Sequence, residues 1–371
     1  MKHVKLNKYY YEKTIIIINM KSLVLLIITQ CLFLLLSCSS NTTDKNPIIR
    51  NAQTFDLNDF QEIKELVSEN LDLDTLDIVP LDIEVLDNYL ISRNKADEKL
   101  FTVINLAKKE IVANHINVGQ GPEDMLYPSF VGYDNDYIYI CDQQTSKINI
   151  YKKNDMLNND NLNSIKQISF DKRIINRIRL LNNGFIGSVY QPFMKYIFNN
   201  EGITIDSIPY PIIDKELTEM ENFDTFQNDA CSDGNKKIAI TYFSTDVIDF
   251  YNQNGILLKR LHGPDQFISR VKEVTYKNGA ISSQYVGAIY DAYANPRNIN
   301  NELWVLYSGK NSEEAHYEYS NNYIFTFSWE GKPLMAYHLN IGITSYAVDT
   351  NKRIIYAVTE QPDTHLITFV Y

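Results

Sequence analysis

Two adjacent acid pairs, Glu123-Asp124 and Glu313-Glu314, are the side chains in this sequence that could transfer protons or bind calcium. Acid-base catalysis requires two carboxylates in different environments, and a calcium site requires several oxygen ligands around one ion. The chain is itself acidic, with a formal net charge of −11 over 371 residues. On such a chain neighbouring acids are typical of solvated loops, so we assign neither pair a catalytic role.

The sequence contains none of the linear motifs that mark common enzymes and metal sites. A G-x-S-x-G elbow, an H-E-x-x-H helix, a C-x-x-C pair and a G-x-x-x-x-G-K loop are all absent. The six histidines are scattered without ligand spacing. Gly119-x-Gly121 is followed by Pro122 and Glu123, where a dinucleotide-binding helix would have to begin. The sequence therefore predicts no cofactor, no metal and no catalytic residue.

Cys38 is the residue with the clearest chemical assignment. The segment Leu35-Leu36-Ser37-Cys38 resembles the bacterial lipobox, in which a peptidase cuts before the cysteine and its thiol receives a lipid such as palmitate. A basic start at Met20-Lys21 and the apolar run 23–36 precede it, a run too short to span a membrane comfortably. Ser39 stands where an aspartate would indicate inner-membrane retention. We expect an exported protein, lipid-anchored in the cell envelope, at the outer membrane.

Composition divides the chain into four parts. Residues 1–19 fit neither the signal nor the fold, and we interpret them as a leader created by a start codon assigned too early. Residues 20–37 are the signal peptide, and the polar residues 38–50 are a flexible tether with too little apolar surface to fold. Residues 51–371 form the folded domain. No basic stripe is present, so nucleic acid is excluded as a partner.

The folded part repeats a short apolar strand about every fifty residues. These strands start 48, 48, 53, 65 and 51 residues apart, at Tyr89, Tyr137, Phe185, Ile238, Leu303 and Ile354. From the second repeat on, a polar loop and another strand follow, as in 148–151 and 248–251. Three repeats then enter a glycine turn, at Gly202, Gly255 and Gly331, as a tight hairpin requires. Four strands in about fifty residues is the unit of a propeller blade.

The ends of the chain indicate how the ring closes. The sixth repeat stops at Tyr371 after its third strand, so an N-terminal strand must complete the last blade. We expect the donor to be 53–57 or 76–79, with a short amphipathic helix over 58–71 between them. The stretches 214–226 and 266–280 are insertions between blades. An irregular β-sandwich is the alternative, but it has no fifty-residue period. The predicted fold is therefore all-β: a six-bladed β-propeller of four-stranded blades, monomeric, closed by an N-terminal strand.

Several segments resemble a known family. These are Val118-Gly119-Gln120-Gly121-Pro122-Glu123-Asp124, 289–293, 303–309 and 329–333, with His262-Gly263-Pro264-Asp265 as a partial echo of the first. Together, over 72–371, the chain is similar to the TolB-like six-bladed propeller lipoproteins of Bacteroides-type bacteria. The resemblance implies the fold, export and lipidation. It implies no chemistry, because a fold does not determine function, although the TolB-like name points to a periplasmic scaffold that contacts envelope proteins.

Propeller geometry predicts where a binding site would lie. The loops after each second strand share one face with the loops between blades, and the glycine hairpins lie on the other face. Binding sites favour such loops around a central cavity, and tyrosines there suit peptides or sugars. The candidate binding face comprises Arg93, Glu123, Asp142, Tyr190, Tyr242, His262, Asp265 and Tyr307.

The sequence favours a non-enzymatic module that binds an envelope protein, a peptide or a glycan. The alternative is a hydrolase or lyase with a metal or paired carboxylates at the central channel. Such a site is assembled from single residues of separate blades and leaves no linear motif. Periplasmic or outward display stays open, and protease treatment of intact cells distinguishes the two.

The anchor assignment predicts the masses of two species. The precursor should begin at Met20, and the mature protein should begin at Cys38 with an acyl modification that Cys38→Ala lacks. Intact mass spectrometry of both proteins measures this directly. A precursor beginning at Met1 contradicts the internal start, and an unmodified Cys38 contradicts lipidation.

Overall fold

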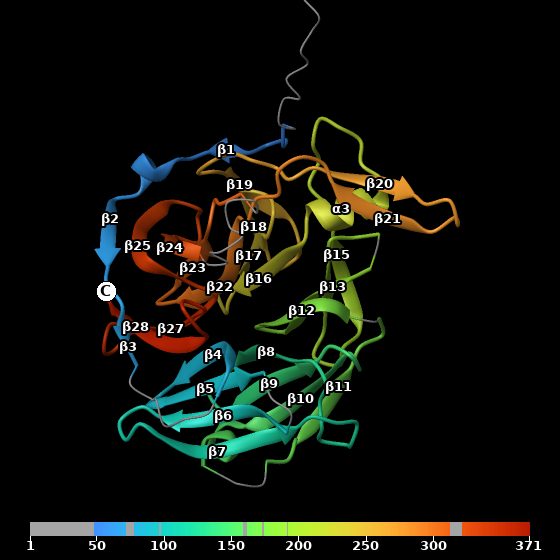
Figure 1. The fold of residues 1–371 in the computed structure, drawn as a ribbon. Coiled ribbons are helices and arrows are strands. Elements are labelled where there is room, and N and C mark those ends of the chain that lie inside the picture. The colour runs from blue at the N-terminus through green and yellow to red at the C-terminus, as the bar shows by residue number, and fades with distance from the viewer. Residues whose placement is uncertain are drawn as a thin grey trace, which may run out of the picture. The chain divides into compact units, whose positions relative to one another are not determined.

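Short antiparallel strands dominate the structure, a computed structural model that describes residues 48–71, 78–95, 98–158, 162–172, 174–190, 192–311 and 321–371. The leader, the signal peptide and the tether up to Pro47 lie outside these residues. Many strands are buried along most of their length, because their period of two turns one set of side chains toward each neighbouring sheet and both sets are covered. The described residues form an all-β, six-bladed propeller, as the repeat predicts (Figure 1).

The first three blades are antiparallel meanders in chain order. Blade 1 comprises β4 (Pro80–Leu86), β5 (Tyr89–Asn94), β6 (Lys99–Asn105) and β7 (Glu110–Asn117). Blade 2 comprises β8 (Pro128–Tyr133), β9 (Tyr137–Asp142), β10 (Lys147–Lys152) and β11 (Lys166–Ser169), with the short helix α2 (Lys153–Asn158) before its last strand. Blade 3 comprises β12 (Ile174–Leu181), β13 (Gly184–Val189), β14 (Lys195–Phe198) and β15 (Thr204–Ile208).

The remaining three blades follow the same plan. Blade 4 comprises β16 (Asn228–Ser232), β17 (Lys237–Tyr242), β18 (Val247–Asn252) and β19 (Leu257–His262). Blade 5 comprises β22 (Tyr293–Ile299), β23 (Glu302–Tyr307), β24 (Asn321–Phe327) and β25 (Pro333–Ile343). Blade 6 has β26 (Ser345–Asp349), β27 (Ile354–Thr359) and β28 (His365–Val370). The six repeat strands expected from the sequence are the second strands of the six blades.

Two insertions lie outside the blades. The first contains helix α3 (Glu219–Thr225), which begins with a capping box between Thr218 and Glu221. The second forms a separate hairpin of β20 (Val271–Thr275) and β21 (Ile281–Tyr285). The Ser283 hydroxyl donates to Asp224, and the Glu273 amide donates to Glu221, so the hairpin is bonded to α3.

The ring is closed by the N-terminal segment, as expected, but by a different part of it. The fourth strand of blade 6 is β3 (Glu69–Asn70), which pairs antiparallel with β28. Of the expected donors, Gln53–Thr54 forms β1, which instead pairs parallel with β19 of blade 4. In the other, only residues 78 and 79 are described, and they lie in no strand. The donor was thus predicted wrongly and the closure correctly.

The expected amphipathic helix over 58–71 was also wrong. A 3₁₀ turn at Leu57–Asp59, capped by Asp56, leads into β2 (Glu62–Leu66), which pairs parallel with β25 of blade 5. Ile63 and Val67, which a helix over these residues would place on its apolar face together with Phe60, are both exposed. A helix of this length is marginal in water, whereas the open edge of β25 offers hydrogen-bond partners to the backbone.

We call residues 48–71 the belt, because they run along the outer edges of blades 4, 5 and 6 (Figure 1). The belt begins at Ile48–Arg50, residues expected in the tether. Ile49 is buried and bridges to Ile213, and the Arg50 amide donates to the Ile212 carbonyl. Phe55 and Phe60 then enter the core between blades 4 and 5, with the Phe60 ring 4.7 Å from that of Phe325.

Apolar side chains fill the space between neighbouring blades all round the ring. The described residues form six buried clusters, and each joins two adjacent sheets. One of them joins the last blade to the first, where Ile83 and Leu90 pack with Tyr356 and Val358. Cys141 and Cys231 are buried and free.

The belt predicts a sharp difference between two of its side chains. Phe60 is 7% exposed and Ile63 is 46% exposed. Phe60→Ala should lower the free energy of unfolding by about 3–5 kcal/mol, because it empties an aromatic site, and Ile63→Ala by less than about 1 kcal/mol. Urea unfolding of both variants tests this. Equal effects would contradict the role of Phe60 as the anchor of the belt.

Candidate functional site

A central cavity of about 720 Å³ is lined by residues from the innermost strand of all six blades. The strands are β4, β8, β12, β16, β22 and β26, and the lining includes Glu84, Phe130, Arg179, Ala230, Arg297 and Ala347. Hairpin residues Asp134, Asn182 and Gly234 also line it, so the cavity reaches the face on which first and second strands are joined. A site here draws on residues far apart in sequence.

Arg297 holds two carboxylates on one side of this cavity. Its guanidinium donates to Glu84 at 2.6 Å and to the Ile83 carbonyl at 2.9 Å, and lies 3.6 Å from Asp82. Burial raises the pKa of Glu84 although Arg297 opposes this. Burial also raises the pKa of Asp82. The positive charges of Arg297, Arg177 and Arg93 outweigh this effect, so the pKa of Asp82 lies below its usual value. Two carboxylates on one strand are therefore shifted in opposite directions.

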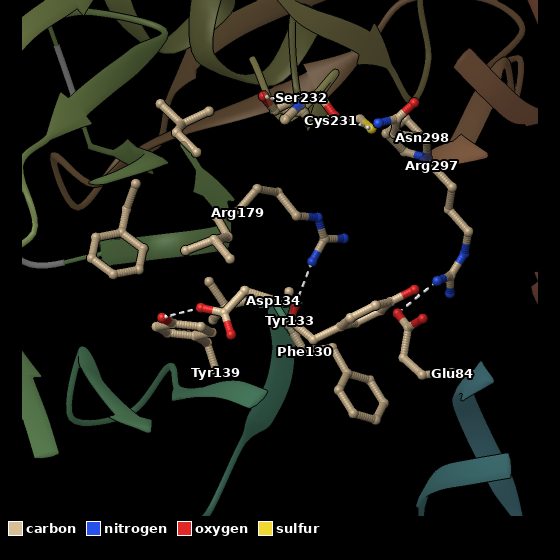
Figure 2. A pocket seen from close by; sticks show the side chains of 18 of the residues that line it. Glu84, Phe130, Tyr133, Asp134, Tyr139, Arg179, Cys231, Ser232, Arg297 and Asn298 are labelled. Carbon is tan, nitrogen blue, oxygen red and sulfur yellow. Dashed lines mark hydrogen bonds and ion pairs between the residues drawn. The ribbon is translucent and has the colours of Figure 1, made fainter. Parts of the chain in front are cut away.

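A second charge centre lies at Asp229. Its Oδ2 accepts from Arg177 at 3.0 Å and from Arg179 at 2.5 Å, so one carboxylate oxygen faces two guanidinium groups. Burial would raise the pKa of Asp229, but the two arginines lower it to about 2. Arg179 also donates to the Phe130 carbonyl, and Figure 2 shows Arg179 and Arg297 reaching into the cavity from different strands.

Lys195, the first residue of β14, is 0% exposed, and its Nζ has no hydrogen-bond partner. Burial lowers the pKa of Lys195 to about 8, against the opposing attraction of Asp229. Cys231, which lines the cavity, is the obvious nucleophile by residue type. Burial raises its pKa to about 12, so it remains a neutral thiol near pH 7 and is poorly nucleophilic.

None of the eight residues of the predicted binding face lines the cavity. Asp142, Tyr242, His262 and Tyr307 are buried. The Tyr242 hydroxyl donates to Asp249 at 2.7 Å, and Asp142 accepts from the Tyr127 amide and the Thr145 hydroxyl. Burial lowers the pKa of His262. These side chains support the blades internally.

The other four are more accessible, and the structure joins only Asp265 to another predicted residue. Asp265 accepts the Tyr307 hydroxyl at 2.6 Å. Glu123 is partly buried and accepts from Ser164, and Tyr190 is 48% exposed with its ring 5.2 Å from Phe223. The Nε of Arg93 is buried without a partner near Asp82.

The glycine-proline-acid motif is explained by blade junctions. In the segment 118–124, Asp124 accepts from the Gly121 amide at 3.1 Å and from Asn117 at 3.1 Å, which fixes the turn between β7 and β8. The similar segment 262–265 is fixed by a residue that is not part of it, the buried Asp246. Its Oδ2 accepts the amides of Asp265 at 2.7 Å and Gln266 at 2.8 Å. The motif therefore has a structural explanation that does not involve a dinucleotide.

The sequence reasoning missed the charged side chains of the innermost strands. The signal was present as Asp82-x-Glu84 and Arg177-x-Arg179, because charges two residues apart lie on the same side of a strand. Charges on the innermost strand of a blade are enclosed by the other blades and need compensation, which distinguishes them from solvated loop acids.

Among the described residues, no helix is both long and apolar enough to cross a membrane. Within those same residues, no group of three or more His, Cys, Asp or Glu is arranged to hold a metal ion.

Comparison with known proteins identifies a family and a fold. A family model described as TolB-like 6-blade propeller-like matches residues 59–351. No curated protein matches the sequence. A Bacteroides fragilis protein named as a putative exported protein is 12% identical to this chain. Its structure has a TM-score of 0.50 over 84% of this chain and 99% of its own.

Two further solved structures are similar at 10% identity. A DUF4221 family member from Bacteroides vulgatus has a TM-score of 0.50 over 82% of this chain and 95% of its own. Raptor from Chaetomium thermophilum has a TM-score of 0.46 over 82% of this chain, which spans 28% of that protein. At these identities the likeness concerns the fold.

Asp246 predicts a pH-dependent stability. Burial raises its pKa to about 7 from an ordinary 3.8, although the amides of Gln266 and Asp265 oppose this. The native state thus keeps the proton at pH values where the unfolded chain has lost it. The free energy of unfolding should therefore fall by up to about 1.4 kcal/mol per pH unit as pH rises from about 4 to 7.

Urea titrations at several pH values test this, because Asp246→Asn should lose that part of the slope while keeping an acceptor for the two amides. Asp265 is exposed and, like Asp246, is contacted by the Tyr307 hydroxyl. Asp265→Asn therefore serves as the control and should keep the slope. Parallel pH curves for Asp246→Asn and the unmodified protein would overturn the assignment.

Proposed function

The chain belongs to the TolB-like six-bladed propeller family, and from this premise we propose that it is a non-enzymatic binding module of the cell envelope. Lipid on Cys38 tethers it to the outer membrane, and the central cavity receives part of a protein, peptide or glycan partner. The observation that carries the proposal is the cavity itself, about 720 Å³ at the meeting point of six blades. Pockets of this size with a few convergent polar groups are typical binding sites.

Because of where the cavity lies, we place the proposed binding face on the opposite side of the propeller from the one expected from the sequence. The residues first expected to bind lie near the ends of second strands or at the junctions between blades, and half of them are buried. The cavity instead reaches the hairpin face, where Tyr133 at the end of β8 is 46% exposed. An aromatic side chain with a polar tip beside charged groups suits a polar partner. Tyr190 and Asp265 remain candidates for a second contact with the partner.

The envelope location rests on the lipobox-like segment and on the family. The tether from Ser39 holds the propeller away from the membrane, so the domain needs no membrane-facing surface of its own. A propeller of four-stranded blades with its ring closed is a complete folding unit, which fits a monomeric module.

A hydrolase or lyase is the second candidate, and one observation favours it. Asp82 and Glu84 lie together in the cavity wall with pKa values shifted in opposite directions, as in acid-base pairs. Arg297 contacts both, which equally explains them as an ion-pair network. If the protein is such an enzyme, Glu84→Gln should abolish its turnover of substrate. A binding module shows no turnover with or without this substitution.

The binding-module proposal predicts partner capture that depends on the cavity. The tagged, lipidated protein should retain a stoichiometric partner from mildly solubilised native envelopes, identified by mass. Asn182→Trp places a large ring on an exposed residue of the cavity lining and should abolish capture. Asn183→Trp, at the exposed neighbour outside that lining, is the matched control and should keep it.

Cys38→Ala should leave the membrane fraction. Equal capture by both tryptophan variants, or no partner at all, would contradict the proposal.

A further inference from the structure

The side chains that line the central cavity carry three negative and three positive charges, and the charged side chains that interact with them from behind add more positive than negative charge, although the whole chain is acidic at −11. Within the described residues, the interacting set has five basic and three acidic members: Arg93, Arg177, Arg179, Arg297 and Lys195 against Asp82, Glu84 and Asp229. At the rim, Asp134 and Lys166 add one charge of each sign. The inner charges therefore leave an excess of two positive charges.

The pairing pattern shows where this excess lies. Arg177 and Arg179 both donate to one oxygen of Asp229, and Arg177 also donates to Asn295. Arg297 is matched by Glu84 at 2.6 Å, with Asp82 further away at 3.6 Å. Lys195 Nζ is fully buried without a hydrogen-bond partner, and so is the Nε of Arg93.

Buried positive charge that exceeds the nearby negative charge is costly in a medium of low dielectric constant. A negatively charged group in the cavity would offset that cost. Guanidinium groups present parallel N–H donors that match the paired oxygens of a carboxylate or phosphate. Arg179 and Arg297 both line the cavity and reach into it from blades 3 and 5 (Figure 2).

We propose that the cavity binds an oxyanion, namely the carboxylate or phosphate group of a small molecule, with Arg179 and Arg297 as its direct ligands. Lys195 and Arg177 act behind them by keeping the site electropositive. The inference rests on the proposed binding function and specifies the chemistry of the ligand. A volume of about 720 Å³ accommodates a charged monosaccharide or a compound of similar size.

Isothermal titration calorimetry of the full lipidated protein in detergent tests the inference with three probes: inorganic phosphate, glucuronate and glucose. Phosphate or glucuronate should bind, with an affinity that falls as salt rises, and neutral glucose should not. Binding of phosphate alone identifies a phosphate site, and binding of glucuronate alone a carboxylate site. Binding of neither anion overturns the inference.

Variants assign the binding to the cavity. Arg179→Met should weaken the anion that binds by roughly tenfold or more, and Glu84→Gln should tighten its binding because it removes a negative charge. Arg353→Met, at an exposed arginine of the hairpin between β26 and β27, is the matched control and should bind unchanged. Unchanged affinity in Arg179→Met, or an equal loss in Arg353→Met, overturns the inference.

Thermal melting shows whether each variant is folded. If Arg179→Met does not fold, Arg179→Lys keeps the charge, loses the paired donors, and should still bind the anion more weakly. Failure of this inference is distinguishable from failure of the binding function. If Asn182→Trp abolishes partner capture while no anion binds, the module stands and the oxyanion site does not.

Discussion

Closure of the ring is the constraint on which the rest of the structure depends. Each blade buries its apolar faces only against its two neighbours, so the core between blades 6 and 1 forms only if the last sheet meets the first. Blade 6 reaches the end of the chain with three strands, and β3 of the belt supplies the fourth. Without it, β28 would present unpaired backbone groups at the edge of the sheet. The belt thus ties the first described residues to the last.

The same closure creates the central cavity. Arg297 of blade 5 meets Glu84 of blade 1 across more than two hundred residues of sequence, at 2.6 Å. Arg179 of blade 3 meets Asp229 of the neighbouring blade 4. The contact between Arg297 and Glu84 exists only when the innermost strands surround one axis, so this part of the charge network depends on ring closure.

Much of the fold was predictable from the sequence, and the reasons are local. Strands such as 137–140 and 303–306 combine β-branched and aromatic residues between turn signals, and their spacing identifies the blades. The belt was not predictable, because residues 62–66 became a strand only through the open edge of β25. The same reason moved the closing strand from 53–57 to Glu69–Asn70, since both pairings are set by distant edges.

The site was predicted less well, because position at a strand end does not determine exposure. Tyr242 and Tyr307 stand where a rim was expected, but both are buried; the Tyr242 hydroxyl donates to Asp249 and the Tyr307 hydroxyl to Asp265. The charged residues of the cavity and its surroundings are spread over several strands far apart in sequence, and only the i, i+2 spacing of Asp82 with Glu84 and of Arg177 with Arg179 marks them. Buried ion pairs contribute little net stability, and apolar replacements of similar volume are often neutral or stabilising. Six apolar clusters already join the blades, so the oxyanion that we propose gives the basic side chains around the cavity a role that blade packing does not.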